Sequence, residues 1–212
     1  MSQLTKEQSP MRIIGGEYRH RTIQGPKGDE TTRPITDRVK QSVFDRLTVL
    51  GVFEGPALDL FSGTGSMGLE SLSRGASHCT FIDRDRSARQ ILESNIKELG
   101  CADQSTVLSA DIAGGAWASM LMHQPMDVVF CDPPYLMARE QMDRVARIIE
   151  LCHPITDAGG VLVLRTDEYA KPQDITGWKL AESLTYGAMR VYMYYRLADD
   201  LESQPVEADS EQ

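Results

Sequence analysis

Apolar and polar residues follow two different spacings along the middle of the chain. Short apolar runs predict buried strands at residues 56–61, 78–83, 105–110, 126–131 and 160–165. Between these runs, apolar residues recur at helical spacing, which predicts helices at about 66–74, 85–99, 112–122 and 138–152. Because strands and helices alternate in this way in parallel sheets that are covered by helices, the pattern predicts a doubly wound α/β fold.

The region before the first of these strands has a pattern of its own. Residues 11–24 predict two short strands around Gly15–Gly16, a small β-hairpin. Thr36–Asp37 then starts a helix that ends near Gly51, because apolar residues follow at helical spacing. We therefore expect an N-terminal hairpin and helix, residues 11–52, packed on a main domain at residues 53–197.

The C-terminal part predicts an antiparallel pair of strands. Residues 178–185 and 189–197 are rich in strand-forming residues and flank a turn at Tyr186–Gly187. Beyond them, residues 198–212 are acidic and poor in apolar groups, and residues 1–10 are polar. We expect both tails to be disordered.

Charge is unevenly distributed over the 212 residues. The net charge is −9, which argues against a generally basic nucleic-acid binder. Residues 198–212 hold six acids and no base, whereas residues 11–47 hold eight bases against five acids. A local basic patch can bind phosphates in an acidic protein, although a solvated face explains the same charges equally well. The candidates for such phosphate contacts are Arg12, Arg19, Arg21, Arg33, Arg38 and Lys40.

Several classes of protein do not fit the sequence. No apolar run approaches the roughly 20 residues that span a membrane, and the N-terminus has no secretory signal. The four cysteines show no C-x-x-C spacing, so we expect buried free thiols in a reducing, cytoplasmic compartment. The four histidines are scattered and predict no metal site.

A glycine-rich turn joins the first main strand to the next helix. Gly63, Gly65 and Gly68 follow the apolar run that ends at Phe61. Glycines at such a turn let a ligand approach the bare main chain at the helix N-terminus. The spacing also fits the dinucleotide fingerprint, with Asp83 twenty residues on, so the turn alone leaves NAD and other adenosine ligands open.

Four acids cluster at the predicted carboxyl edge of the sheet. Asp59 lies inside an apolar strand, where a carboxylate is costly unless it meets a polar ligand or backbone donors. Asp83, at a strand end, is placed to accept the ribose hydroxyls of an adenosine, and Asp111 to meet the adenine amino group. Each acid alone fits a helix cap, but their recurrence at strand ends favours a ligand site. The fourth acid, Asp132, begins the next motif.

The motif Asp132-Pro133-Pro134-Tyr135 follows the strand at 126–131. Two prolines stiffen the backbone and remove two N–H donors, so the Pro133 carbonyl and the Asp132 carboxylate can both accept hydrogen bonds from a ligand. Two acceptors aimed at an exocyclic base amine can hold it while its lone pair faces a methyl donor. Tyr135 supplies a ring on which the base can stack.

Together these motifs resemble class I methyltransferases that use S-adenosylmethionine (SAM) and methylate amino groups. Over residues 11–197 the chain resembles the RsmD family in particular. The matching segments are Met11-Arg-Ile-Ile-Gly-Gly, Arg33-Pro-Ile-Thr-Asp-Arg-Val-Lys40, Leu58-Asp-Leu-Phe-Ser-Gly-Thr-Gly65, Gly68-Leu-Glu-Ser-Leu-Ser-Arg-Gly75 and Tyr186-Gly187. The family more often has Thr in place of Ile35, and many members have Phe in place of Tyr135.

The resemblance implies methylation of the N2 amine of a guanine in 16S rRNA, by a monomer that acts on naked RNA or on an assembling small ribosomal subunit. It implies a Rossmann-like class I methyltransferase sheet, seven-stranded, and no metal. We assign cofactor binding to Asp59, Gly63, Thr64, Gly65, Asp83, Arg84 and Asp111, with Asp59 near the cofactor's ammonium. We assign the base pocket to Asp132, Pro133, Pro134 and Tyr135. The phosphates of the RNA are assigned to the six basic residues Arg12, Arg19, Arg21, Arg33, Arg38 and Lys40. The alternatives are a DNA adenine-N6 methyltransferase, an NAD-dependent oxidoreductase and a binding-only RNA chaperone.

Overall fold

The computed structural model describes residues 11–26, 35–171 and 174–198. Residues 1–10, nearly all of the acidic tail, and Arg33 lie outside the described residues, so the expectations for them stay predictions. The main sheet has seven strands in the order β5-β4-β3-β6-β7-β9-β8. Their bounds are β3 (Ala57–Leu60), β4 (Cys79–Ile82), β5 (Ser105–Leu108), β6 (Met126–Cys131), β7 (Thr156–Asp167), β8 (Trp178–Tyr186) and β9 (Met189–Arg196).

Strands β3 to β7 run parallel, and β9 and β8 complete the sheet as an antiparallel hairpin. This arrangement confirms the predicted doubly wound sheet with its final hairpin. The predicted strand at 160–165 was too short, because β7 begins at Thr156. Thr156 is buried, but residues 157–159 after it are exposed, so the start of β7 carries no apolar signal.

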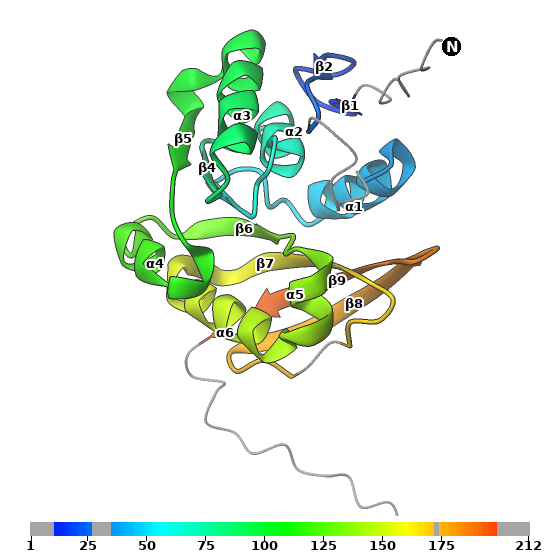
Figure 1. Cartoon of the computed structure of the whole chain (residues 1–212), viewed down its shortest axis with the longest axis vertical. Coiled ribbons are helices and arrows are strands. Elements are labelled where there is room, and N and C mark those ends of the chain that lie inside the picture. Colours follow the sequence, from blue (N-terminus) through cyan, green and yellow to red (C-terminus); the bar gives the residue numbers. More distant parts are fainter. Residues whose placement is uncertain (1–10, 27–34, 172–173, 199–212) are drawn as a thin grey trace, which may run out of the picture.

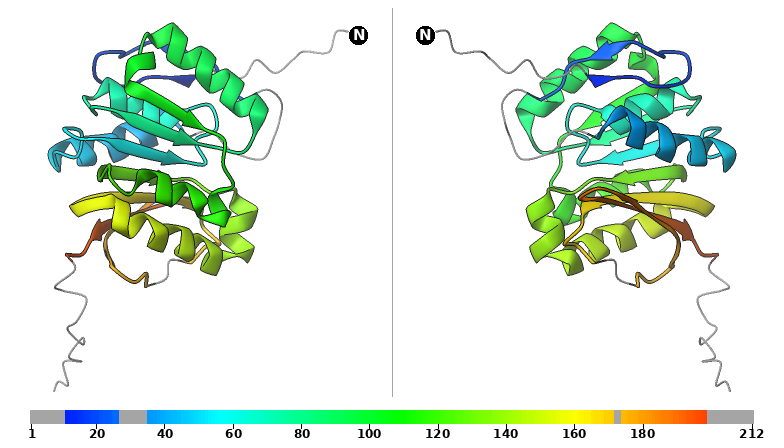
Figure 2. Two further views of the ribbon diagram at one scale, coloured as in Figure 1. Left: turned by 90° about the vertical axis from the view of Figure 1, so that its left-hand side faces the viewer. Right: turned by 90° about the vertical axis from the view of Figure 1, so that its right-hand side faces the viewer.

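Helices cover both faces of the sheet (Figures 1 and 2). Residues of α1, α2 and α3 join one core, whereas α4 and α6 pack into the other. The bounds are α1 (Asp37–Val49), α2 (Ser66–Ser73), α3 (Arg86–Leu99), α4 (Ala116–Leu121), α5 (Tyr135–Glu140) and α6 (Met142–Cys152), with 3₁₀ turns η1 (Ala102–Gln104), η2 (Ile112–Gly114) and η3 (His153–Ile155). Within the described residues, no helix is both long and apolar enough to cross a bilayer.

Two predicted helices are each divided in the structure. The predicted helix at 112–122 consists of η2 and α4, because Gly115 lies between them with a left-handed φ of 74°. The predicted helix at 138–152 consists of α5 and α6, which are separated at Gln141, where φ is −136°. The first of the two begins at Tyr135, directly after the double proline. The break matters because it brings α5 beside the end of β7 (Figure 1).

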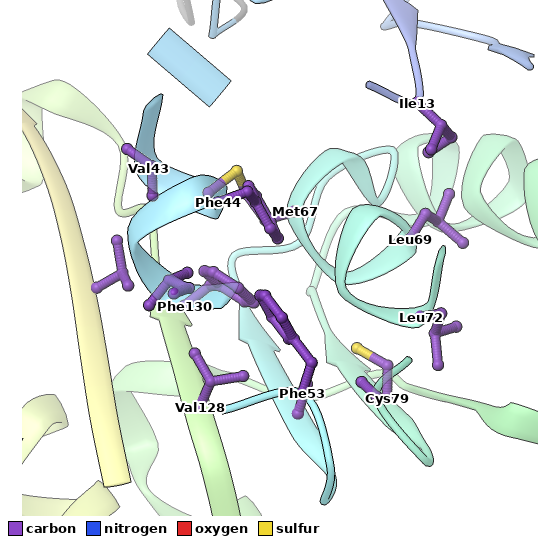
Figure 3. Packing of buried hydrophobic residues seen from close by; sticks show 14 of the residues in the cluster. Ile13, Val43, Phe44, Phe53, Met67, Leu69, Leu72, Cys79, Val128 and Phe130 are labelled. Carbon is purple, nitrogen blue, oxygen red and sulfur yellow. The ribbon is translucent and has the colours of Figure 1, made fainter. Parts of the chain in front are cut away.

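The N-terminal hairpin and helix share the core of the α2–α3 face. Strands β1 (Met11–Arg12) and β2 (Thr22–Ile23) are antiparallel and lie beside α2 and α3 (Figures 1 and 2). In α1, Phe44 stacks on Phe53 and Phe130 with ring centroids 5.6 and 5.4 Å apart (Figure 3). The helix begins as predicted, with the Thr36 hydroxyl accepting the Val39 N–H.

A buried ionic group fastens this hairpin to α2. The fully buried Glu70 carboxylate accepts the N–H groups of Ile14 and Gly15 at 2.8 and 2.9 Å. It also pairs with Lys40 of α1, whose Nζ lies 3.2 Å away, and with Arg74. Burial lowers the pKa of Lys40, and the Glu70 carboxylate opposes that shift. All four cysteines are buried and free, as predicted.

Candidate active site

The cavity that combines the predicted site residues lies where the strand order reverses. β3 pairs with β4 on one side and with β6 on the other, and open parallel sheets bind ligands at this switch point, beyond the carboxyl ends of the strands. The cavity has a volume of about 550 Å³. Its walls include the glycine turn, the acids at the strand ends and, from the N-terminal part, Met11, Pro26 and Ile35.

Each glycine of the turn has a different role. Gly63 lines the cavity with φ of 53°, and a Cβ there would have only the Phe61 carbonyl oxygen near it, at 4.0 Å. Gly65 precedes α2 with φ of 89° and does not line the cavity. A Cβ on Gly68 would lie 2.3 Å from the Phe81 ring, so this glycine allows α2 to pack closely on β4. Of these three glycines, only Gly63 therefore lines the cavity.

Asp83 holds the glycine turn in place. Its Oδ2 accepts the Gly63 N–H at 2.8 Å and its Oδ1 accepts the Asp85 N–H at 2.8 Å. The cap of α3 is Asp85, which accepts the Ala88 N–H, so Asp83 is not a helix cap. Each Asp83 oxygen keeps one further lone pair for a ligand. Thr64 and Arg84, which the sequence analysis assigned to cofactor binding, also line the cavity.

Asp59 and Asp111 differ sharply in their surroundings, although both line the cavity. Asp59 is only 1% exposed and accepts the Gly68 N–H at 2.9 Å. Burial raises the pKa of Asp59 to about 8, although this hydrogen bond opposes the shift. Asp111 is exposed and caps η2 by accepting the Ala113 N–H at 3.3 Å. Its cap role and its place in the cavity wall therefore coexist.

Asp132 forms a two-point ion pair that the sequence analysis missed. Arg165, near the end of β7, donates from Nε to Asp132 Oδ1 at 2.8 Å and from Nη2 to Oδ2. Burial alone would lower the pKa of Arg165, but the Asp132 carboxylate more than offsets this and raises it. Arg165 also lines the cavity. The sequence could have indicated Arg165 as a candidate site residue, because it is a charged residue in an apolar strand, like Asp59.

Two buried hydroxyls in the cavity wall point to a polar ligand. Ser62 Oγ and Ser66 Oγ are buried, and within the described residues neither has a hydrogen-bond partner. Both serines line the cavity. Because a buried hydroxyl without a partner costs free energy, these atoms are expected to bond to whatever fills the cavity. Sequence reasoning missed both serines, since they lie within a turn that was read for its glycines.

The predicted base pocket is only partly gathered at the cavity. Asp132 and Pro134 line it, whereas Pro133 is buried and Tyr135 is half-buried without being part of the wall. Leu136, Met137, Gln141 and Arg144 extend the wall beyond the motif. The proposed stacking of a base on Tyr135 therefore stays a prediction.

The residues that were predicted to contact RNA phosphates include exposed arginines and one buried lysine. Arg12, Arg19, Arg21 and Arg38 are exposed. Arg12 pairs with Asp37 at 2.5 Å, and Arg21 donates to the Glu98 carbonyl. The prediction that Lys40 contacts RNA phosphates is corrected, because this side chain is 2% exposed and its ammonium pairs with the Glu70 carboxylate. Its place at helical spacing among apolar residues was the missed signal.

Solved structures of other proteins share this fold. The E. coli protein titled "Putative methyltransferase yhhF" is 28% identical, with a TM-score of 0.72 over 90% of this chain and 100% of that one. A Haemophilus influenzae structure described as a methylase is 27% identical, with a TM-score of 0.68 over 90% of this chain and all of its own. The seven-stranded sheet and the site at its switch point define a Rossmann-like class I methyltransferase.

The sequence comparisons narrow the class to one family. A family model described as "Conserved hypothetical protein 95" matches residues 11–195, and the chain belongs to this family. The chain is 31% identical to "Putative rRNA methyltransferase YlbH" of Bacillus subtilis over 87% of its length and 98% of the relative's. It is 30% identical to "Ribosomal RNA small subunit methyltransferase D" of E. coli over 89% and 91%. These matches confirm the predicted RsmD-type methyltransferase.

Proposed function

We propose that this chain transfers the methyl group of SAM to the exocyclic N2 amine of a guanine in 16S rRNA. The observation that carries the proposal is the switch-point cavity, where an acidic wall adjoins the turn that begins at Asp132. The E. coli relative is named as a small-subunit rRNA methyltransferase, which supports the substrate. We expect the enzyme to act as a monomer, on naked RNA or on an assembling subunit.

The charge of the cavity supports SAM over NAD. SAM carries a sulfonium and an ammonium against one carboxylate, so it is a net cation, whereas NAD brings two phosphate anions. The acids in the cavity wall outnumber the bases even without Asp59, whose pKa of about 8 keeps it protonated at neutral pH in the free protein. They are Asp83, Asp85, Asp111 and Asp132 against Arg84, Arg144 and Arg165. An acidic cavity favours the cationic ligand.

The hydrogen bonds of the glycine turn support the same choice. A dinucleotide site needs free N–H groups at this turn for the pyrophosphate. Here the N–H of Gly63 donates to Asp83, that of Gly65 to the Ser62 carbonyl and that of Gly68 to Asp59. These donors are already satisfied within the protein, which argues against the oxidoreductase alternative.

The residues of the cavity fit SAM in its main parts. The lone pairs that remain on Asp83 suit the ribose hydroxyls, and Asp111 suits the adenine amino group. The hydroxyls of Ser62 and Ser66, which have no partner among the described residues, suit the polar methionine end, with the buried Asp59 facing a cation. When bound, SAM supplies an electrophilic methyl group on its sulfonium sulfur.

Asp132 acts on the base by orienting it. A guanine N2 amine is a weak nucleophile because its lone pair is delocalised into the ring. Asp132 accepts an N–H of this amine and turns the lone pair toward the methyl group. The Arg165 pair fixes the carboxylate and leaves each oxygen a second lone pair for this contact. An aryl amine is far too weak an acid for a carboxylate to ionise, so the proton leaves nitrogen only after the new N–C bond makes it acidic.

The DNA adenine-N6 alternative finds less support. Such an enzyme needs a region that recognises its DNA target, and the connections at this edge of the sheet are short. They are residues 61–65 after β3, 83–85 after β4 and 132–134 after β6. The two relatives that match this chain over 98% and 91% of their own length are named as rRNA methyltransferases.

Single-turnover methyl transfer to unmodified 16S rRNA, with the product nucleoside mapped, tests the proposal. Asp132→Ala should leave SAM affinity nearly intact and slow transfer by at least about a hundredfold, as expected for a lost orienting group. Asp132→Asn keeps an acceptor oxygen and should retain more activity than Ala. Transfer at the wild-type rate by Asp132→Ala would exclude our assignment of the base pocket.

A second variant separates chemistry from folding. Asp132→Ala leaves the buried Arg165 without its main anion, and breaking such a pair costs about 3–5 kcal/mol. The double variant Asp132→Ala/Arg165→Met removes both charges, so it should recover stability in urea denaturation. It should still transfer methyl slowly, because the acceptor for the N2 amine is absent.

A further inference from the structure

An exposed tyrosine contacts α5, the helix whose first turn lines the active-site cavity. Tyr169 follows β7 and is 65% exposed, which is unusual for so large an aromatic side chain. The Arg139 guanidinium, from α5, covers one face of the ring at 4.6 Å from its centroid. Arg139 in turn pairs with Asp167, whose Oδ1 accepts the N–H of Tyr169 at 3.0 Å. The guanidinium of Arg139 therefore lies over one face of the ring, while most of the Tyr169 surface stays exposed.

The same contacts tie this ring to the base turn. Arg165 and Asp167 are two residues apart on β7, so their side chains share one face of the strand. Arg165 pairs with Asp132, and Asp167 pairs with Arg139, which follows Asp132 by seven residues. Two ion pairs thus fasten the segment from the base turn through α5 to the end of β7.

The strip between the ring and the cavity is also exposed. Leu136 lines the cavity and is 63% exposed. It lies one helical turn before Arg139 on α5, so the two side chains are neighbours on the helix surface. Leu136 therefore connects the cavity wall to Arg139, whose guanidinium lies over the Tyr169 ring.

We infer that Tyr169 and Arg139 form a stacking platform for an unpaired RNA base next to the methylated nucleotide. The inference rests on the proposed function. Sequence-specific RNA recognition targets unpaired bases, which stack on aromatic rings and guanidinium planes. The acids beside the ring do not oppose a phosphate chain strongly, because Asp167 pairs with Arg139 and Glu168 lies 4.0 Å from Arg190.

Binding of a single-stranded oligoribonucleotide tests the platform directly, without turnover. Tyr169→Ala should weaken this binding roughly fivefold to a hundredfold, the range for loss of one stacked base. Tyr169→Phe keeps the ring and should bind within about twofold of wild type, whereas Tyr169→Leu should resemble Ala. The same strand in a duplex should show little difference between the variants, because its bases are already stacked.

Met120→Ala is the matched control. Met120 has the same exposed fraction, 65%, but lies near the end of α4, which leads to the amino end of β6 and away from the cavity. Single-turnover transfer with saturating SAM should show the Tyr169→Ala defect as a weaker RNA affinity, with the rate at saturating RNA changed less. SAM affinity should be unchanged in every variant.

Unchanged single-strand affinity in Tyr169→Ala would overturn the platform, and so would an equal loss in Met120→Ala. Either result would leave the proposed function standing, provided that the wild-type protein methylates 16S rRNA. Failure of the wild-type protein to methylate rRNA would instead reject the proposed function.

Discussion

A carboxyl group sealed inside a protein is hard to ionise, and Asp59 is in that position. It is buried beneath the glycine turn and accepts the Gly68 N–H. The carboxylates of Asp132 and Asp83 lie near enough to disfavour its charge further. A cationic ligand in the cavity would reverse this balance, so the residue is costly in the free protein and useful with SAM bound.

The raised pKa of Asp59 predicts a pH-dependent stability. Its folded-state value of about 8 lies above the unfolded value of 3.8. The protonated group is favoured in the folded state, so this contribution is fully present below pH 3.8 and is lost as pH rises through 8. Asp59→Asn cannot ionise. The free energy of unfolding of Asp59→Asn minus that of wild type should therefore grow from pH 5 to pH 8.

Urea denaturation across that pH range measures the difference, with Asp85→Asn as the control. The pKa of Asp85 is lowered by its hydrogen bonds with Ser87 and Ala88, so it stays ionised throughout the range. Its variant should differ from wild type by a constant amount. A pH-independent difference for Asp59→Asn as well would show that the buried carboxyl is not the source.

Arg165 shows what a single sequence can and cannot give at the residue scale. Both it and Asp59 are charges within apolar strands, so the sequence marks each as needing a partner. The partner is not marked, because Asp132 and Arg165 are 33 positions apart and meet only through the pairing of β6 with β7. The acids at strand ends could be predicted as a group, whereas the ion pair between Asp132 and Arg165 could not.

At the scale of elements, the strand–turn–helix unit from β3 to α2 separates two roles for glycine. Gly63 leaves space in the cavity, and Gly68 leaves space between α2 and β4. The sequence presents both only as glycines of one turn. The structure distinguishes a glycine that borders the cavity from one that packing requires.

These two glycines should respond differently to the same methyl group. Gly68→Ala should destabilise the protein by about 1–3 kcal/mol through overpacking against Phe81. Gly63→Ala meets no close neighbour and should cost only about 1–2 kcal/mol for its left-handed φ. It should weaken SAM binding, because its methyl group enters the cavity. Urea denaturation and calorimetry measure the two effects, and equal SAM affinity for Gly63→Ala and wild type would contradict the assignment.

The junction between the N-terminal hairpin, α1 and α2 depends on Glu70. Glu70→Ala would leave Lys40 buried without its anion and two backbone N–H groups without an acceptor. We expect a loss of about 3–5 kcal/mol in urea denaturation. Glu182→Ala, which removes the partly exposed pair with Arg46, should cost at most about 1 kcal/mol. Equal losses would mean that the buried group does not hold the junction.

Element types were easier to predict than element breaks. The alternation of apolar runs predicted the parallel sheet, because each run is a buried strand. The breaks at Gly115 and Gln141 were missed, since helical spacing of apolar residues continues across both. The second break lets α5 pack against the end of β7, where Arg139 contacts the Tyr169 ring.

At the scale of the whole molecule, two separate parts of the chain enclose the cavity. The N-terminal part contributes Met11, Pro26 and Ile35, and the opposite wall comes from the base turn, α5 and α6. The predicted phosphate contacts belong to the N-terminal part, and the proposed stacking platform belongs to the opposite part. A net charge of −9 therefore does not exclude RNA binding, because phosphates respond to the charges of the local surface that they approach.

The exposed arginines of the N-terminal part should determine the salt dependence of RNA binding. We expect Arg19→Gln, Arg21→Gln and Arg38→Gln, combined, to weaken RNA binding and to flatten the plot of log affinity against log salt. Each lost phosphate contact should reduce the slope by about one unit, because fewer counterions are released. Filter binding at several salt concentrations measures this slope. Arg33 belongs to the same predicted group but lies outside the described residues.

Arg46→Gln is the matched control for charge. Arg46 lies in the last turn of α1 and pairs with Glu182, so neutralising it changes net charge without removing a candidate phosphate contact. Its slope should equal that of wild type, and SAM affinity should be unchanged in both proteins. If the triple variant keeps the wild-type slope, the arginines are only solvated charges. An equally flattened slope in Arg46→Gln would instead mean that net charge alone governs RNA binding, with no particular basic surface.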